Sequence, residues 1–153
     1  MSRRTFFRYF SGKDELVSAR LLASGDRLAA ALAARPDSEP AWPALRAALE
    51  ALVTDVEDHE DIARPLHLML QQEPEVRAAA HERGHRWLQL LEPIVAQRLA
   101  RTDPAAYADL RARALIGSAL ACFDATQLVW AAQPGSRLGP LLDEAMQAVA
   151  PIR

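Results

Sequence analysis

Apolar residues recur along this chain mostly at helical spacing, and no run of alternating β-branched residues of the kind that predicts strands appears. Alanine, leucine, arginine and glutamate, which all favour helices, dominate the periodic segments. The pattern predicts helices over residues of about 2–10, 13–34, 41–57, 60–72, 74–101, 104–133 and 137–150. With no long linker and no internal repeat between them, these helices predict a single all-α helical bundle.

The breaks between the predicted helices are marked by turn and capping residues. They fall at Pro36–Pro40, Glu73-Pro74, Thr102-Asp103-Pro104 and Pro134-Gly135-Ser136. Pro65 and Pro93 lie inside two of the predicted helices. Because proline lacks a backbone N–H and clashes with the carbonyl four residues earlier, we expect each to kink or split its helix.

Composition places the chain among ordinary folded cytosolic proteins, with 50% hydrophobic residues, 25% charged residues and a net charge of −2. A single cysteine, Cys122, cannot form an internal disulfide, and its apolar surroundings predict an inert core thiol. No apolar segment follows the basic N-terminus, and Ser118, Asp124, Thr126 and Gln127 interrupt the longest apolar stretch. We therefore expect a cytoplasmic protein with no membrane partner.

The N-terminal end carries most of the positive charge. Residues 1–20 hold five basic and two acidic side chains, whereas the whole chain has a net charge of −2. A basic end on an acidic body suggests an anionic partner, of which nucleic acid is the commonest large one. A solvated basic terminus explains the charge equally well.

The opening stretch reads as a short helix, a turn and a longer helix. Ser2 can cap the first helix, in which Phe6 and Phe10 lie four apart on one face and Arg4 and Arg8 on another. Gly12 ends this helix or caps the next, which Lys13 opens.

These residues carry a resemblance. The run from Ser2 to Phe10, followed by Gly12-Lys13-Asp14-Glu15-Leu16, resembles the third helix and the start of the fourth in the TetR family of one-component transcriptional regulators. The remaining helices are similar to that family only in architecture. The resemblance implies a remnant of a helix-turn-helix DNA-binding domain over residues 1–18 and an effector-binding, dimerisation domain over 19–153. It further implies a repressor that acts as a homodimer. The apolar face of the predicted helix over 104–133 predicts that the dimer pairs through the 104–133 and 137–150 helices, since an apolar face that large should not stay exposed.

The chain departs from the family by lacking the two helices that precede this one and complete the helix-turn-helix domain. We expect an in-frame extension of roughly 30 to 50 residues before codon 1, encoding those helices. A natural truncation and a deliberately shortened chain stay open as alternatives.

The resemblance also implies a set of DNA contacts. Arg3 and Arg4 would reach base edges or phosphates, and Ser2 would begin the helix that lies in the major groove. Thr5, Tyr9 and Lys13 would hold phosphates, since a hydroxyl, a phenol and an ammonium at a helix N-terminus suit phosphate oxygens.

The predicted helix over 104–133 is apolar nearly all round from Ala114 to Ala132, which indicates burial on two sides. One side could line a cavity and the other a subunit interface. The candidate ligand contacts are Phe123, Asp124, Gln127 and Trp130 on this helix, and His67 and Trp87 on helices that would face the cavity in the family. Packing within the core is the plainer explanation for each. An apolar lining would suit a small hydrophobic or aromatic effector, and no cofactor is indicated.

His81-Glu82-Arg83-Gly84-His85 satisfies the zinc motif H-E-x-x-H. The helical period, however, places Val76, Ala80, Trp87, Leu91 and Ile94 on the buried stripe and both histidines on its flank or the solvent side. No third ligand follows at the usual spacing, and neighbouring arginines would repel a cation. We therefore expect no metal and no enzyme. The alternatives to a TetR-like regulator are a helical interaction scaffold without a ligand and, less favoured, a zinc metallopeptidase.

Overall fold

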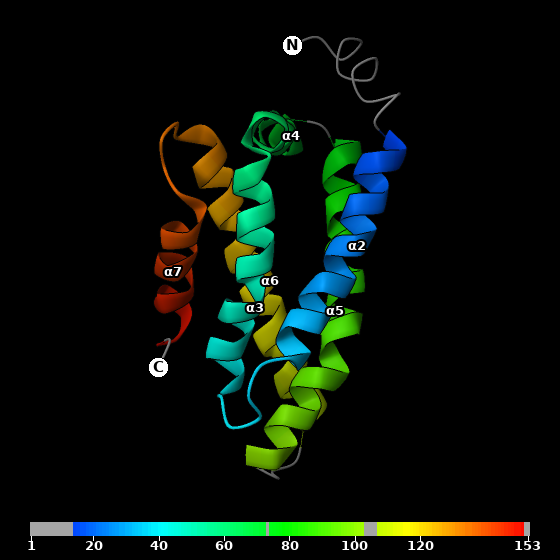
Figure 1. The fold of residues 1–153 in the computed structure, drawn as a ribbon, viewed down its shortest axis with the longest axis vertical. Helices are drawn as coiled ribbons and strands as arrows, with labels where there is room; N and C mark the ends of the chain where they lie inside the picture. The colour runs from blue at the N-terminus through cyan, green and yellow to red at the C-terminus, as the bar shows by residue number, and fades with distance from the viewer. Residues whose placement is uncertain (1–13, 73, 103–106, 152–153) are drawn as a thin grey trace.

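The protein is a bundle of helices in the part of the chain that the computed structural model describes, residues 14–72, 74–102 and 107–151. Labelled as in Figure 1, its helices are α2 (Asp14–Ala33), α3 (Ala41–Asp58), α4 (Glu60–Gln72), α5 (Pro74–Thr102), α6 (Ala108–Ala132) and α7 (Leu138–Val149). No strand occurs among these residues. The predicted all-α fold is therefore confirmed.

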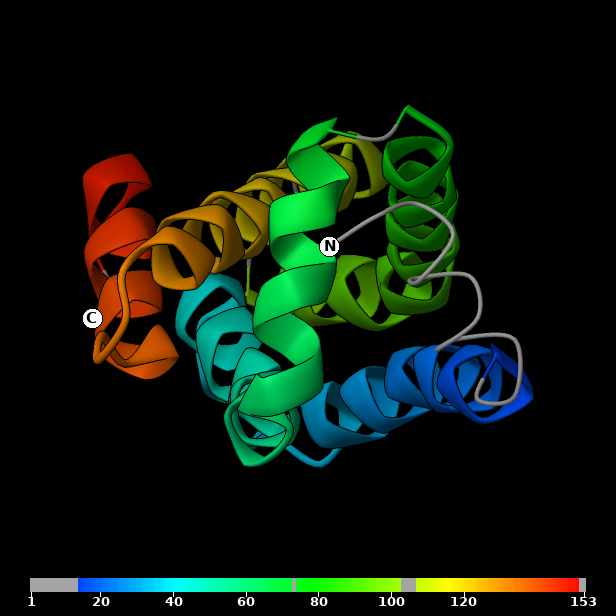
Figure 2. The same ribbon diagram turned by 90° about the horizontal axis from the view of Figure 1, so that it is seen from above.

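The long helices run roughly along one axis, and the shorter α4 closes one end. Helix α2 packs against α3 and α5, while α6 packs against α5, α3 and α7 (Figure 1). Seen from above, α4 lies across the end of the bundle and contacts α6, α5 and α3 (Figure 2). The space beneath α4 is therefore walled by several helices at once, which is where a cavity can form.

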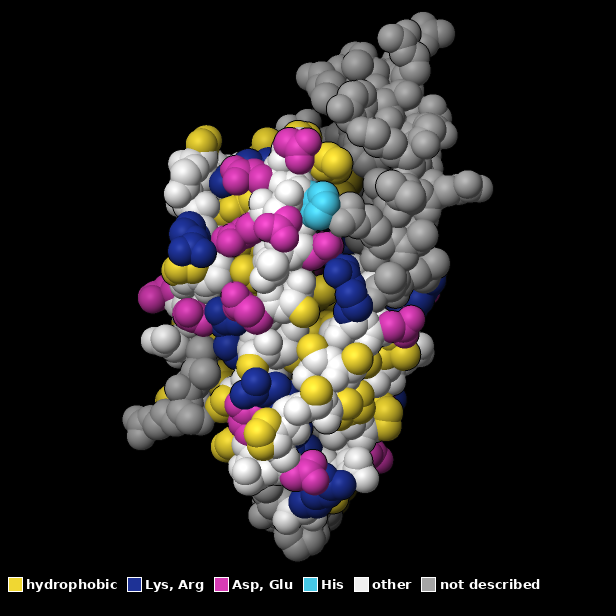
Figure 3. All heavy atoms as spheres, in the orientation of Figure 1, with side chains coloured by type: hydrophobic (Ala, Val, Ile, Leu, Met, Phe, Trp, Pro, Cys, Tyr) yellow, Lys and Arg dark blue, Asp and Glu magenta, His cyan; other side chains and the backbone are white. Residues whose placement is uncertain are grey.

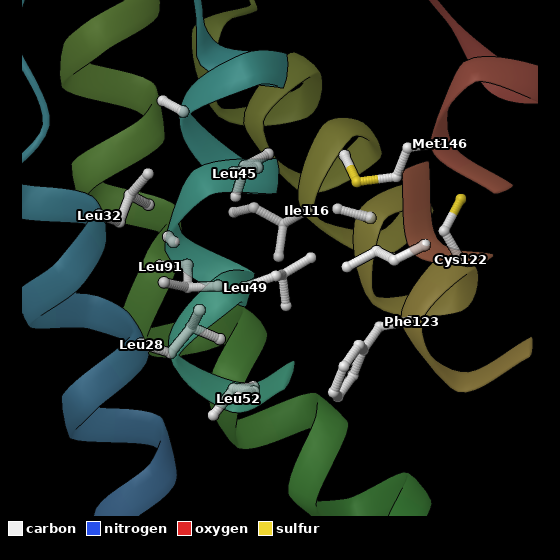
Figure 4. Close-up of a cluster of buried hydrophobic side chains, with 14 of the residues drawn as sticks. Leu28, Leu32, Leu45, Leu49, Leu52, Leu91, Ile116, Cys122, Phe123 and Met146 are labelled. Atoms are coloured by element: carbon white, nitrogen blue, oxygen red, sulfur yellow. The ribbon is translucent and has the colours of Figure 1, made fainter. Parts of the chain in front are cut away.

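The core is built largely from leucines that repeat at helical spacing. Leu28 and Leu32 of α2 and Leu45 and Leu49 of α3 are at most 1% exposed. They meet Leu91 of α5, as Figure 4 shows, with side chains of α6 and α7 completing the cluster. One face of α2 and one face of α3 thus bury a stripe of leucines, and each leucine contributes roughly 1.5 to 3 kcal/mol of hydrophobic transfer free energy.

Two helix C-termini are held by arginines from other helices. Arg98 of α5, 4% exposed, donates to the carbonyls of Leu32 (3.4 Å), Arg35 (3.1 Å), Pro36 and Glu39 (2.9 Å) at the end of α2. Arg64 of α4 donates to the carbonyl of Trp130 and to those of Gln133 (3.2 Å) and Ser136 (3.4 Å) after α6. These guanidinium groups add a charged donor to carbonyls at the helix ends, where the only other donors are local backbone N–H groups such as those of Arg35 and Gln133.

Ion pairs join α7 to α3 across the surface. Arg46 of α3 pairs with Glu50 at 2.7 Å and with Asp143 of α7. Glu57 accepts a hydrogen bond at 2.7 Å from the backbone N–H of Leu138, the first residue of α7. Acidic and basic side chains lie interspersed over this face in Figure 3, an ordinary solvated surface.

The predicted helix bounds agree with the structure within a residue or two, except at the start of α6. A helix beginning at 104 is wrong, because Tyr107 has a left-handed backbone with φ 74° and α6 begins at Ala108. From the sequence we expect Pro65 and Pro93 each to kink or split its helix, and neither splits it, since α4 and α5 continue through both. The predicted helix over 2–10 lies outside the described residues.

Helix α6 is buried on one side and apolar on the other. Ile116, Ala119 and Phe123 are at most 2% exposed, whereas Leu110 is 65% exposed and Val129 43%. By length and composition α6 could cross a membrane, but half of its most apolar window is buried inside the bundle, as in the core helices of soluble proteins. Cys122 is buried against α7, and burial raises the pKa of its thiol, as expected for an inert core cysteine.

Candidate functional site

A cavity of about 130 Å³ lies beneath α4. Its lining comes from five helices: Ser24 of α2, Leu52, Asp55 and Val56 of α3, His59 at the α3–α4 junction, Ile62, Ala63, Leu66 and His67 of α4, Arg83 and Trp87 of α5, and Phe123 and Gln127 of α6. Most of this lining is apolar. Because a cavity of roughly 150 Å³ accepts benzene, this one suits a single ring or a short alkyl group.

The position of Trp87 in this lining depends on Gly25 of α2. A Cβ atom added to Gly25 would lie 2.8 Å from Cδ1 and 3.0 Å from Nε1 of Trp87. A normal side chain therefore cannot occupy position 25 unless the indole moves. Glycine lets α2 and α5 approach closely here, and that approach holds the indole of Trp87, which is 7% exposed, against the cavity.

A second, larger pocket of about 780 Å³ adjoins the cavity. It lies between the first turns of α5, the second half of α4 and the C-terminal part of α6. Its lining is Arg77, Ala78, Ala80, His81, Glu82, Arg83, His67, Asp124, Gln127 and Leu128. His67, Arg83 and Gln127 line both spaces. These three side chains therefore form the boundary between a small apolar cavity and a wider, charged pocket.

His67 is a buried, neutral imidazole at this boundary. It is 5% exposed, and burial lowers its pKa from 6.5 to about 4, with the positive charge of Arg83 acting in the same direction. Its ring meets Trp130 edge to face, with centroids 6.4 Å apart. No hydrogen bond joins its ring nitrogens to another described residue, so one donor and one acceptor remain for a ligand or water.

Arg83 brings a positive charge to the same boundary. Its guanidinium lies 5.2 Å from the ring centroid of Trp87, and burial lowers its pKa. Asp124 opposes that change electrostatically, but within the described part of the chain no carboxylate lies within 4 Å of Arg83. Partial desolvation raises the pKa of Asp124, and the charges of Arg83 and His81 oppose it.

Gln127 is the polar side chain that α6 contributes to this boundary. It is 5% exposed and makes no hydrogen bond to another described residue. Thr126 beside it bonds back to the carbonyl of Cys122 at 2.7 Å. The amide of Gln127 is thus the polar group of α6 that is available to a molecule in either space.

The structure brings most of the predicted ligand contacts together. His67, Trp87, Phe123 and Gln127 line the cavity, and Asp124 lines the adjoining pocket. Trp130 lies in neither lining: it is 1% exposed, with His67 at its edge and the Arg64 guanidinium 4.1 Å from its ring centroid. The most important residue that the sequence analysis missed is Arg83, whose spacing of four from Trp87 is a signal for a cation–π pair.

The residues of the H-E-x-x-H motif do not converge. His81 and His85 are exposed, in line with the predicted position of the two histidines on the flank or the solvent side. Glu82 is also exposed and pairs with Arg86 at 3.5 Å. His81 and Glu82 border the larger pocket, whereas His85 does not. Within the described ranges, no group of three or more His, Cys, Asp or Glu side chains is placed to hold a metal ion.

The predicted DNA contacts Ser2, Arg3, Arg4, Thr5, Tyr9 and Lys13 lie outside the described residues. They remain predictions.

A comparison with known protein families identifies the family to which this arrangement of helices belongs. The model of the MftR C-terminal domain, a TetR C-terminal domain, matches residues 39–152, from just before α3 to beyond α7. The chain belongs to this family. Domains of this type generally bind effectors and dimerise, and they are typically regulatory rather than enzymatic parts of cytoplasmic proteins. No helix-turn-helix domain is detected in the chain. Searches of curated proteins and of solved structures found no match.

Proposed function

We propose that this chain is the effector-binding and dimerisation part of a cytoplasmic TetR-type transcriptional repressor. The observation that carries the proposal is the cavity beneath α4, lined by Trp87 and Phe123 and bordered by His67 and Gln127. Its size and apolar character suit a small hydrophobic or aromatic effector. Binding there would favour one arrangement of the helices over another, and thereby change operator affinity.

A cavity-filling variant tests the effector site. Ala63→Phe adds a ring to the lining of the cavity, whereas Ala30→Phe adds the same ring to an exposed position on α2. We expect indole and other small aromatic probes to bind the unmodified protein and Ala30→Phe, with loss of binding in Ala63→Phe, measured by calorimetry. Equal binding in all three proteins would refute a site in this cavity.

We also propose that α6 and α7 pair two copies of the chain. Ala114, Ala121, Ala125 and Leu128 are exposed on α6 at helical spacing, and a Cβ added to Gly117 would meet nothing within 4 Å. An exposed, apolar stripe of small residues lets a second helix approach closely and bury it. Ala121→Arg should therefore yield monomers in sedimentation at micromolar concentration, while Ala30→Arg should not. A monomeric unmodified protein would refute the dimer.

The proposed domain division assigns residues 1–18 to a helix-turn-helix remnant and 19–153 to the body. Joined to two helices that complete a helix-turn-helix domain, the chain should bind its operator specifically. Arg4→Ala should cost about 1 to 3 kcal/mol if Arg4 reads a base, whereas Lys13→Ala should weaken all sequences alike and flatten the salt dependence by about one unit. Titrations against the neighbouring promoter and scrambled DNA at several salt concentrations would measure this. If the promoter is not preferred and both variants are silent, an interaction scaffold is the better description.

A further inference from the structure

We propose that the effector is an organic anion, with an apolar group in the cavity beneath α4 and a carboxylate or phosphate held by Arg83. The inference rests on the proposed effector site and specifies the chemical class of its ligand. It follows from the way the apolar cavity and the charged pocket meet at His67, Arg83 and Gln127. A molecule that occupies both spaces must pass these three side chains.

Around the boundary, in the part of the chain that the structure describes, the guanidinium groups without an ion-pair partner outnumber the carboxylates without one. Of the carboxylates that line the two spaces, Asp55 pairs with Arg27 at 3.2 Å and Glu82 pairs with Arg86 at 3.5 Å. Asp124 is the remaining one, and it shares the larger pocket with two guanidinium groups, those of Arg77 and Arg83. Neither arginine has an ion-pair partner among the described residues.

Arg83 is also positioned to bind an anion, unlike a freely moving arginine on the solvent-exposed surface. Trp87 lies against its guanidinium, at 5.2 Å from ring centroid to Cζ, which limits where the planar group can lie. A guanidinium presents paired N–H donors that match the two oxygens of a carboxylate or phosphate. Because the site is partly removed from water, such a contact is stronger there than on the open surface.

The neutral polar groups at the boundary complement this arrangement. His67 and Gln127 are each 5% exposed, and neither has a hydrogen-bond partner among the described residues. At neutral pH His67 is uncharged, so it offers a hydrogen bond without adding to the positive charge. A ligand oxygen bound to Arg83 could also accept from the amide of Gln127, which would orient the ligand across the boundary.

The experiment compares probes that differ only in their head group. We would titrate the full chain with ω-phenylalkanoates of three to eight carbons, the matching alcohols, the phosphate monoesters of those alcohols, and the matching ammonium compounds. The acid or the phosphate should bind at least about tenfold more tightly than the alcohol, since a hydrogen bond to a charged group contributes about 1.5 to 3 kcal/mol. Comparing acid with phosphate shows which anion is preferred.

Substitutions of the positively charged Arg83 and of the negatively charged Asp124 test how Arg83 contributes to anion binding. Arg83→Gln should bring the affinity for the anion to within about threefold of that for the alcohol, and Arg83→Lys should restore part of the difference. Asp124→Asn should tighten anion binding several-fold because it removes a like charge. Arg101→Gln, at the exposed far end of α5, should change nothing. Unchanged binding of the alcohol by Arg83→Gln would show that this variant is folded.

The outcomes separate this inference from the proposed function. Equal binding of acid, phosphate and alcohol, or tighter binding of the ammonium compound, would overturn the anion and leave the effector cavity standing. Binding of no probe, charged or neutral, would overturn both.

Discussion

Replacing Gly25 with alanine should destabilise the protein, although alanine is the better helix former. Two effects oppose each other in this variant. In a helix interior, glycine to alanine stabilises by about 0.5 to 1 kcal/mol. The new methyl group would lie 2.8 Å from Cδ1 of Trp87 and 3.1 Å from Cδ1 of Leu90, however, where ordinary contacts begin at 3.4 Å. Trp87 is 7% exposed, so its ring has little room to retreat. Overpacking of this kind typically costs about 1 to 3 kcal/mol, which exceeds the gain.

Gly84→Ala provides the matched control. Gly84 also lies inside a long helix, but a Cβ atom there would meet nothing within 4 Å. This variant should gain the full helix preference of about 0.5 to 1 kcal/mol. The difference between the two variants cancels that preference and measures the contacts with Trp87 and Leu90, expected at about 1 to 3 kcal/mol. Urea unfolding followed by circular dichroism gives both values. If Gly25→Ala is stabilised as much as Gly84→Ala, the close approach of α2 and α5 is not as described.

Three further predictions follow from single side chains. Arg98→Met should lower the free energy of unfolding, measured by urea unfolding, by about 3 kcal/mol or more, because it leaves the carbonyls after α2 without their charged donor. The control, Arg101→Met, loses only an exposed ion pair with Asp37 and should change the free energy of unfolding by no more than about 0.5 kcal/mol. Folding lowers the pKa of His67 from 6.5 to about 4, so the unfolded chain binds the extra proton first and the free energy of unfolding should fall as the pH drops from 6.5 towards 4. Between pH 7 and pH 4.5, the free energy of unfolding of His67→Gln should fall by on the order of 2 to 3 kcal/mol less than that of the unmodified protein. An equal fall in both proteins would contradict a buried neutral imidazole. Protein purified without chelator should carry no stoichiometric zinc by elemental analysis, and Glu82→Gln should leave folding unchanged; one zinc per chain, lost on changing His81 or His85 to alanine, would revive the metallopeptidase.

The helices could be predicted from the sequence because their signals are local. The leucine spacing in α3 and the breaks at Pro36–Pro40 and Pro134–Ser136 mark their elements without reference to the rest of the chain. The exceptions have local causes too. Tyr107 adopts a left-handed backbone that its residue type does not favour. Pro93 lies on the exposed side of α5, where water can satisfy the carbonyl that loses its N–H partner, so α5 continues through it.

The candidate site was predictable only in part because it depends on how helices face one another. Phe123 and Gln127 could be selected as cavity residues because they lie on the same face of one apolar helix. That Arg83 shares a boundary with them follows from the packing of α5 on α6, which no spacing within α5 reveals. The sequence motif at His81–His85 drew attention to the wrong chemistry, since its arginine, not its histidines, lines the cavity.

Arg64 and Arg98 have a consequence for how the chain folds. Each binds the last carbonyls of a helix that lies 66 residues away in the sequence. A helix that ends on its own glycine or capping residue can settle its length before any docking takes place. In α2 and α6 the last carbonyls accept a local backbone N–H, from Arg35 to Leu32 and from Gln133 to Trp130, but they gain their charged donors only when α5 and α4 are already seated. An excised α2–α3 or α6–α7 hairpin should therefore fray at the capped end. The ends of α2 and α6 are therefore completed in the same event as helix docking. Amide hydrogens in the last turns of α2 and α6 should exchange only through the global unfolding of the bundle.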